Sequence, residues 1–155
     1  MRSLIKFCLS LFDYLTEKKI IEQLKRIFLN EKTISVIDIG AHKGEYISSI
    51  IKNFNISKAY CFEPNPKVFK ILENKNLLNN KIELFNFGAS NNSGNILFNE
   101  NIESSSSSIN ELNKNSNYYK KKFFLLNFLG SGDVTKKIKI KVVTLNDFIK
   151  ENNIK

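Results

Sequence analysis

A short loop with two glycines, between a predicted strand and a predicted helix, constrains the fold of this chain more than any other feature. Residues 33–40 are rich in β-branched side chains and end in glycine, as a buried strand does. Residues 46–54 carry isoleucine and phenylalanine at helical spacing. Between them, Gly40 lets the backbone turn sharply and approach a ligand, and Gly44 opens the helix without a side chain in the way. The free amides of such a turn form an electropositive cradle.

The same alternation continues along the first half of the chain and predicts an α/β fold. Residues 58–63 form a second predicted strand that Pro64 closes, a second helix runs from Pro66 to about residue 78, and residues 82–87 form a third strand. Proline suits the first turn of that helix. The order strand, helix, strand, helix, strand is typical of a parallel sheet with right-handed crossovers.

The second half of the chain changes character and predicts a β-rich insertion followed by a short helix. Its expected elements, in chain order, are a turn at 91–94, a short strand at 95–99, a polar loop at 103–117 with a run of five serines (104–108), a segment at 118–129 that fits a helix or a strand, a strand at 136–143, and a helix from 144 to the C-terminus. The alternation of lysine with isoleucine or valine indicates that the strand at 136–143 is half-exposed.

The N-terminal segment predicts an amphipathic helix that precedes the domain. Apolar residues recur at helical spacing from Leu4 to Leu29, so we expect a helix over residues 1–30 and a domain over residues 31–155. The lysines of this helix would allow peripheral contact with a membrane, but packing on the domain is favoured over that contact and over a secretory signal peptide. No apolar run approaches the roughly 20 residues of a spanning helix.

Charge and cysteine usage narrow the partners and the cellular setting. The formal net charge is +9, but Arg2 and Arg26 are the only arginines among 24 basic residues. Base and phosphate recognition favours the arginine fork, so no nucleic-acid partner is expected. A solvated lysine surface is preferred over an acidic or phosphorylated partner or an anionic membrane face. Cys8 and Cys61 fit neither a disulfide framework nor a metal site, which favours a reduced, cytoplasmic setting without a metal.

The spacing within the loop discriminates between nucleotide ligands. A dinucleotide fold needs Gly-x-Gly-x-x-Gly, but Ala41 and His42 follow Gly40, and the next glycine is Gly44. A phosphate loop is excluded as well, because no Gly-Lys-Ser/Thr sequence follows. An Asp-x-Gly-x-x-x-Gly loop that begins at Asp38 instead suits S-adenosylmethionine, which carries an amino acid and a ribose but no phosphate.

Two acidic residues end the first two predicted strands. Glu63 stands about 20 residues past the loop, where it can accept hydrogen bonds from both hydroxyls of a ribose. Asp38 can either orient the loop or accept hydrogen bonds from a cationic amine. Together the two strand ends predict a nucleoside site.

These residues lie in stretches that resemble the FkbM family of S-adenosylmethionine-dependent methyltransferases. Val-Ile-Asp-Ile-Gly-Ala-His-Lys-Gly-Glu-Tyr at 36–46 and the more specific Cys-Phe-Glu-Pro-Asn-Pro at 61–66 carry the resemblance. Further matches are Asn-Phe-Gly-Ala-Ser at 86–90 with Gly94 soon after, the serine run, and Val-Thr-Leu-Asn-Asp-Phe at 143–148. The resemblance implies a Rossmann-like class I methyltransferase fold and transfer of a methyl group to a hydroxyl oxygen, often on a sugar or a secondary metabolite.

The resemblance also implies which residues hold the cofactor. Residues of the glycine loop would surround its methionine part, namely Asp38, Gly40, Ala41 and Gly44. Glu63 would hold the ribose, and the adenine would lie near Asn65, Phe87, Gly88 and Ala89. His42 joins this predicted cofactor-binding set through its loop position, although a histidine pKa near neutrality would also suit a general base. No residue stands out as the catalytic base.

The family pattern continues beyond the last residue of this sequence. After residues 147–149 the family has another core strand that helps to close the cofactor site, whereas this sequence stops at Lys155. We therefore expect an incomplete doubly wound sheet with an unpaired edge on its first strand. The leading interpretation is the cofactor-binding N-terminal part of a methyltransferase for a small-molecule or glycan acceptor. The alternatives are a non-catalytic remnant or binding module and, less favoured, a lysine-rich binder of nucleic acid or of an anionic surface.

Overall fold

The computed structural model describes residues 2–75, 80–100, 116 and 136–154, with only the backbone of residues 2–14. Its helices and strands, in chain order, are α1 (Arg2–Ile27), β1 (Ile34–Ile39), α2 (Glu45–Asn53), β2 (Ile56–Phe62), α3 (Pro66–Glu73), β3 (Ile82–Phe85), β4 (Gly88–Ala89), β5 (Gly94–Glu100), β6 (Lys136–Val143) and α5 (Leu145–Glu151). The helices and strands predicted in this part of the chain are confirmed, with their ends shifted by a few residues.

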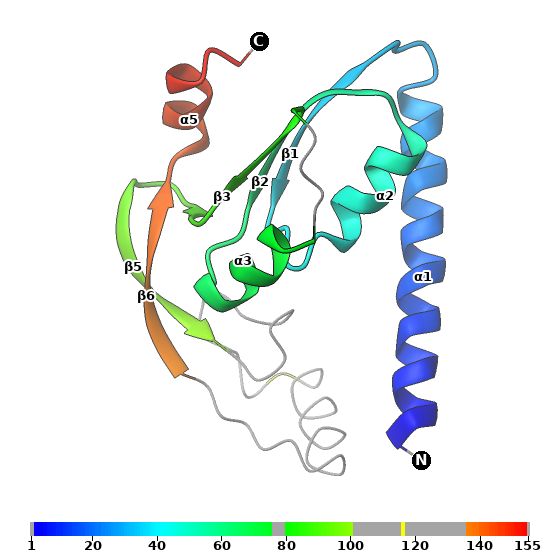
Figure 1. The fold of residues 1–155 in the computed structure, drawn as a ribbon, viewed down its shortest axis with the longest axis horizontal. Helices are drawn as coiled ribbons and strands as arrows, with labels where there is room; N and C mark the ends of the chain where they lie inside the picture. Colours follow the sequence, from blue (N-terminus) through cyan, green and yellow to red (C-terminus); the bar gives the residue numbers. More distant parts are fainter. Residues whose placement is uncertain (1, 76–79, 101–115, 117–135, 155) are drawn as a thin grey trace.

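Strands β1, β2 and β3 form a parallel sheet in the order β1-β2-β3 (Figure 1). Asp38 lies opposite Cys61 and Ile39 lies opposite Phe62, so the carboxyl ends of β1 and β2 are side by side. This arrangement confirms the expected mixed α/β fold with a parallel sheet. The turns that follow the two strands therefore meet at one end of the sheet, where ligands bind in folds of this kind.

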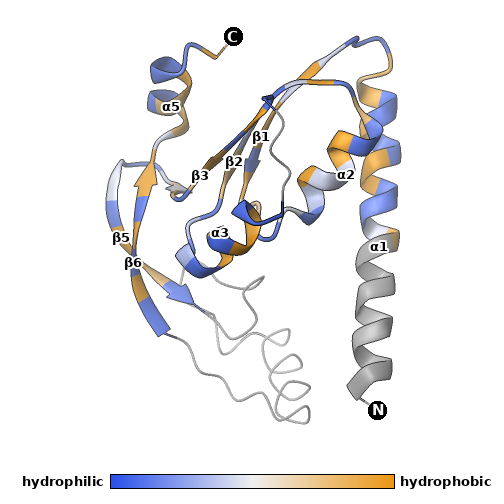
Figure 2. Cartoon of the chain, in the orientation of Figure 1, coloured by the Kyte–Doolittle hydropathy of each residue, from blue (hydrophilic) through white to orange (hydrophobic). Residues whose placement is uncertain are grey.

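Helices α2 and α3 pack on one face of the parallel sheet. Ile47 and Ile50 of α2 and Leu72 of α3 form a buried core with Ala59 and Cys61 of β2. Figure 2 shows the apolar residues that α2 and the neighbouring strands contribute. Burial, with the nearby Asp38 charge, raises the pKa of the Cys61 thiol to about 12, so this cysteine acts as an apolar core residue at neutral pH.

Helix α1 runs alongside α2 (Figure 1). Among the described side chains of α1, Ile21 is buried in the core, and Glu17 accepts a hydrogen bond from the Ser49 hydroxyl of α2. Ile20 and Ile27, which the helical spacing assigns to the apolar face, are exposed. Over the described side chains of α1, which begin at residue 15, contact with the domain is therefore narrower than the sequence pattern predicts. Among the described helices, none combines the length and the apolar character that crossing a membrane requires.

The opposite face of the parallel sheet carries an aromatic cluster that packs on α5. The ring centroid of Phe148, from α5, lies 4.7 Å from that of Phe62 and 5.1 Å from that of Phe85. Tyr60 and Phe87 complete the cluster. The ring of Phe148 meets the other rings of the cluster edge to face, which is a favourable arrangement for aromatic pairs. These contacts hold α5 against the sheet.

The remaining described strands form a second sheet in the order β4-β6-β5. Strand β5 is antiparallel to β6, and β4 is parallel to it. Phe98, Ile140 and Val142 are buried on one face, while the lysines of β6 alternate outward, as the sequence predicts for a half-exposed strand. The polar segment at 103–117, apart from Ser116, and the ambiguous segment at 118–129 lie outside the described residues.

The chain changes sheets just after β3, so the third predicted strand is shorter than expected. Strand β3 ends at Phe85, and Asn86 then turns its side chain amide toward the carbonyl oxygen of Glu63, at 2.8 Å. Gly88 and Ala89 pair with β6 instead of continuing along β2. The expected strand over 82–87 is therefore shortened to 82–85, and a separate two-residue strand of the second sheet follows at 88–89.

Candidate functional site

The loop after β1 turns back on itself through left-handed backbone. Gly40, His42 and Gly44 have φ values of +83°, +50° and +76°. The N–H groups of Gly40 and Ala41 both donate to the carbonyl oxygen of Phe62, at 2.8 and 2.9 Å, which fastens the loop to the end of β2. Glycine relieves the strain of this conformation at positions 40 and 44. A Cβ atom added at Gly40 would meet no described atom within 4 Å, so the backbone there faces open space.

Glu63 joins this loop to the turn that follows β2. Its Oε2 accepts a hydrogen bond from the N–H of His42 at 2.9 Å, and its Oε1 accepts one from the N–H of Asn65 at 2.8 Å. The residue is buried, with 6% of its surface exposed. Each carboxylate oxygen retains a lone pair for a further donor. The structure thus brings together the loop and the acidic residue that the sequence predicts as neighbours.

Asp38 carries an unsatisfied buried oxygen in the same place. Its Oδ2 atom has no hydrogen-bond partner among the described residues. Burial, followed by the charges of Glu63 and Glu45, raises the pKa of Asp38 to about 6. Burial also raises the pKa of Glu63, although the N–H groups of Asn65 and His42 oppose that shift. A cationic group at this point would satisfy the oxygen and relieve the crowding of negative charge.

His42 contributes its backbone to Glu63 and its side chain to another acid. Its Nδ1 lies 3.3 Å from Oε2 of Glu45, and the N–H of Lys43 donates to the same oxygen at 3.1 Å. Glu45 therefore braces the outside of the loop at the start of α2, where a negative charge is favourable. Within the described part of the chain, no three acidic, histidine or cysteine side chains gather as metal ligands.

Asn65 begins α3 and extends the network beyond the predicted residues. It is 2% exposed, and its Oδ1 accepts the N–H of Lys67 at 3.0 Å. Its Nδ2 donates to Oε1 of Glu100 at 3.1 Å, while Lys67 Nζ lies 3.0 Å from Oε2 of Glu100. The sequence reading misses Glu100 and Lys67. Glu100 has no motif around it, and only the pairing of β5 brings it near Asn65.

The structure places the predicted adenine segment in the packing between the two sheets. Phe87 belongs to the aromatic cluster, and its ring centroid lies 4.8 Å from that of Phe62. Gly88 is buried, and a Cβ atom added there would meet Val142 at 3.4 Å and Pro64 at 3.5 Å. Ala89 pairs with β6. This segment therefore adjoins the chain after Glu63 through Pro64 and the end of β2 through Phe62.

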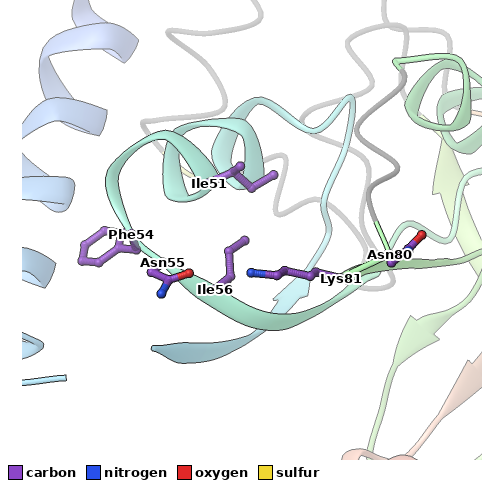
Figure 3. A pocket seen from close by; sticks show the side chains of 6 residues that line it. All are labelled: Ile51, Phe54, Asn55, Ile56, Asn80 and Lys81. Atoms are coloured by element: carbon purple, nitrogen blue, oxygen red, sulfur yellow. The ribbon is translucent and has the colours of Figure 1, made fainter. Parts of the chain in front are cut away.

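A pocket of about 490 Å³ lies elsewhere on the molecule. It is lined at the amino ends of β2 and β3 by Ile51, Phe54, Asn55, Ile56, Asn80 and Lys81 (Figure 3). The parallel order puts this pocket at the opposite end of the sheet from the glycine loop, and its described lining holds no carboxylate. The strand ends, rather than this pocket, therefore carry the candidate site.

The comparison with family models identifies the domain. A family model described as the Methyltransferase FkbM domain matches residues 38–155. A solved structure of the methyltransferase FkbM from Methylobacillus flagellatus KT is similar at 20% identity, with a TM-score of 0.37 over 42% of this chain and 20% of that one. The matched part thus spans a fifth of that structure's length. The comparison with curated proteins finds no match.

Proposed function

This chain belongs to the FkbM methyltransferase family, and from this we propose that it binds S-adenosylmethionine as part of a methyltransferase with a Rossmann-like class I fold. The observation that carries the proposal is the geometry of Glu63. Its buried carboxylate is held by the N–H groups of His42 and Asn65 and keeps lone pairs for two further donors. Two neighbouring ribose hydroxyls are the donors that such a carboxylate accepts in nucleoside sites.

The charge of the site supports a cationic ligand over a phosphorylated one. Asp38, Glu45 and Glu63 lie close together around the loop, and the charges of Glu63 and Glu45 add to the effect of burial in raising the pKa of Asp38. Phosphate groups would be repelled by three carboxylates, whereas an ammonium or sulfonium group would be attracted. Asp38 would accept from the ammonium of the methionine part through its unsatisfied Oδ2. When bound, the cofactor supplies an electrophilic methyl group, and these residues bind and orient it.

The acceptor follows from the family rather than from this site. We propose transfer of the methyl group to a hydroxyl oxygen of a small molecule or glycan, in the cytoplasm. Gly40, Ala41 and Gly44 would line the methionine part, and Asn65, Phe87, Gly88 and Ala89 would lie toward the adenine. No described side chain is assigned as the catalytic base. The N-terminal helix remains a candidate for peripheral membrane contact.

Calorimetric titration of the full chain with S-adenosylhomocysteine tests this function. We expect binding with a micromolar dissociation constant and much weaker binding of NAD and ATP, because both carry phosphates into an acidic site. Glu63→Ala should abolish measurable binding, while Glu83→Gln, a change on a partly exposed strand residue away from the loop, should leave it intact. Absence of binding by the wild-type chain, or a preference for NAD, would contradict the proposal.

A further inference from the structure

Glu100 is a buried carboxylate that reaches the candidate site from the second sheet. It ends β5, 35 residues along the chain from Asn65, and is 8% exposed. One oxygen accepts the Asn65 side-chain amide at 3.1 Å, and the other accepts Lys67 Nζ at 3.0 Å. Both carboxylate oxygens thus accept hydrogen bonds from residues at the start of α3, so Glu100 anchors that end of the helix.

The contact with Glu100 completes the fixation of the Asn65 side chain. The Asn65 amide accepts the Lys67 N–H through its oxygen and donates to Glu100 through its nitrogen, so rotation by half a turn would lose both hydrogen bonds. The same residue donates its main-chain N–H to Oε1 of Glu63. By fixing the Asn65 side chain, the contact with Glu100 also fixes the main-chain N–H of Asn65, which orients the Glu63 carboxylate.

We propose that Glu100 is a positioning residue for the nucleoside site, acting through Asn65 on the orientation of Glu63. This inference rests on the proposed function, because it assigns to Glu63 the ribose of the cofactor. Glu63 follows the end of β2 in the parallel sheet, whereas Glu100 ends β5 in the second sheet. Through the hydrogen bond between Asn65 and Glu100, the orientation of the Glu63 carboxylate therefore depends on the pairing of β5 with β6.

The charge of Glu100 suits this role. The hydrogen bond from Lys67, followed by that from Asn65, lowers the pKa of Glu100, although burial opposes this shift. The group therefore stays ionised at neutral pH. Lys136 adds a further favourable charge. Because the Lys67 side chain is 72% exposed, solvent screens its ion pair with Glu100. The buried, charge-assisted bond to Asn65 is therefore the contact that orders the site.

The experiment compares two ligands across matched variants of the full chain. Two ligands, S-adenosylhomocysteine and its 2′-deoxy analogue, are titrated into the wild type, Glu100→Ala, Glu100→Gln and a control. The control is Glu83→Gln, whose partly exposed ion pair with Lys58 lies away from the loop. The wild type should prefer the ribose form about tenfold or more, as expected for a hydrogen bond to a charged group. Glu100→Ala should weaken S-adenosylhomocysteine about tenfold and reduce that preference, Glu100→Gln should do so less, and the control should match the wild type.

A purely structural role for Glu100 would weaken both ligands equally and leave the preference intact, and this result would overturn the proposal. Unchanged affinity in folded Glu100→Ala would overturn it too, while the proposed function would stand. If the wild type binds neither ligand, the proposed function fails instead. In that case, hydrogen exchange of the main-chain N–H of Asn65, measured without ligand, tests whether Glu100 positions Asn65. Faster exchange in Glu100→Gln than in Glu83→Gln supports the claim, and equal exchange contradicts it. Glu100→Gln also serves if Glu100→Ala does not fold.

Discussion

The carboxylate of Glu63 lies 2.9 Å from the main-chain nitrogen of His42, a residue 21 positions earlier in the chain. This hydrogen bond joins the ends of two adjacent parallel strands into one rigid corner. On one side of the corner the backbone at Gly40 faces open space, and on another Asp38 leaves a buried oxygen unsatisfied. An open backbone at Gly40, a carboxylate fixed by hydrogen bonds and a buried oxygen without a donor are the features that a site for a cationic nucleoside requires.

Replacement of Glu63 should lower the affinity for the cofactor by more than the loss of one neutral hydrogen bond would. Glu63→Gln keeps the size of the side chain but turns an amide NH₂ toward the N–H of His42 or of Asn65, so the corner would open. We expect S-adenosylhomocysteine affinity to fall about 10–100-fold by calorimetry, as for a hydrogen bond to a charged group. Affinity within twofold of the wild type would exclude Glu63 from the site.

Gly40→Ala should weaken both the fold and the binding of cofactor, whereas Gly94→Ala should weaken only the fold. Both glycines have positive φ, at +83° and +152°, and neither has a described atom within 4 Å of an added Cβ. Backbone strain should therefore cost each variant about 1–2 kcal/mol in urea denaturation. Only at Gly40 does the new methyl group enter the space in front of the loop. Equal S-adenosylhomocysteine affinity in the two variants would contradict the loop assignment.

Asp38→Asn should stabilise the ligand-free chain at neutral pH. The pKa of Asp38 is raised from 3.8 to about 6 in the folded state, so ionisation of this group opposes folding. The penalty disappears as the pH falls below the unfolded pKa of 3.8, where Asp38 becomes protonated in both states, and reaches its full size above the folded pKa of about 6. From the linkage between pKa and stability, it amounts to about 2–3 kcal/mol. Urea denaturation of both proteins from pH 4 to 8 should show the variant's advantage grow with pH. A constant difference would contradict the raised pKa.

Phe148→Ala should destabilise the fold strongly, because this ring closes the aromatic face of the parallel sheet. Phe148 is 4% exposed, and its ring centroid lies 4.7 Å from that of Phe62. Removal of a buried phenylalanine ring typically costs about 3–5 kcal/mol. Leu97→Ala, at a position 61% exposed, is the control and should change the free energy of unfolding by less than about 0.5 kcal/mol. Chemical denaturation followed by circular dichroism measures both, and similar values would show that α5 is not held by this ring.

Much of the parallel sheet could be predicted from local patterns. The β-branched run before Gly40, the helical spacing after Gly44 and the proline at the start of α3 each act within a few residues, so the sequence reveals them directly. Parallel order then follows from the alternation of strand and helix. The meeting of the glycine loop with Glu63 could be foreseen for the same reason, since adjacent parallel strands bring their carboxyl ends together.

Other features of the fold depend on contacts between distant parts of the chain. Three contacts join residues that are far apart in the sequence: the pairing of β4 with β6, the packing of Phe148 on Phe62, and the hydrogen bond between Asn65 and Glu100. Such contacts depend on which strand lies beside which and on how side chains pack, and neither periodicity nor spacing encodes that choice. Local patterns in the chain thus specify most of the helices and strands, their order and the position of the glycine loop. Long-range packing decided how the second sheet supports it, because burial and hydrogen bonding across elements arise only once the chain is folded.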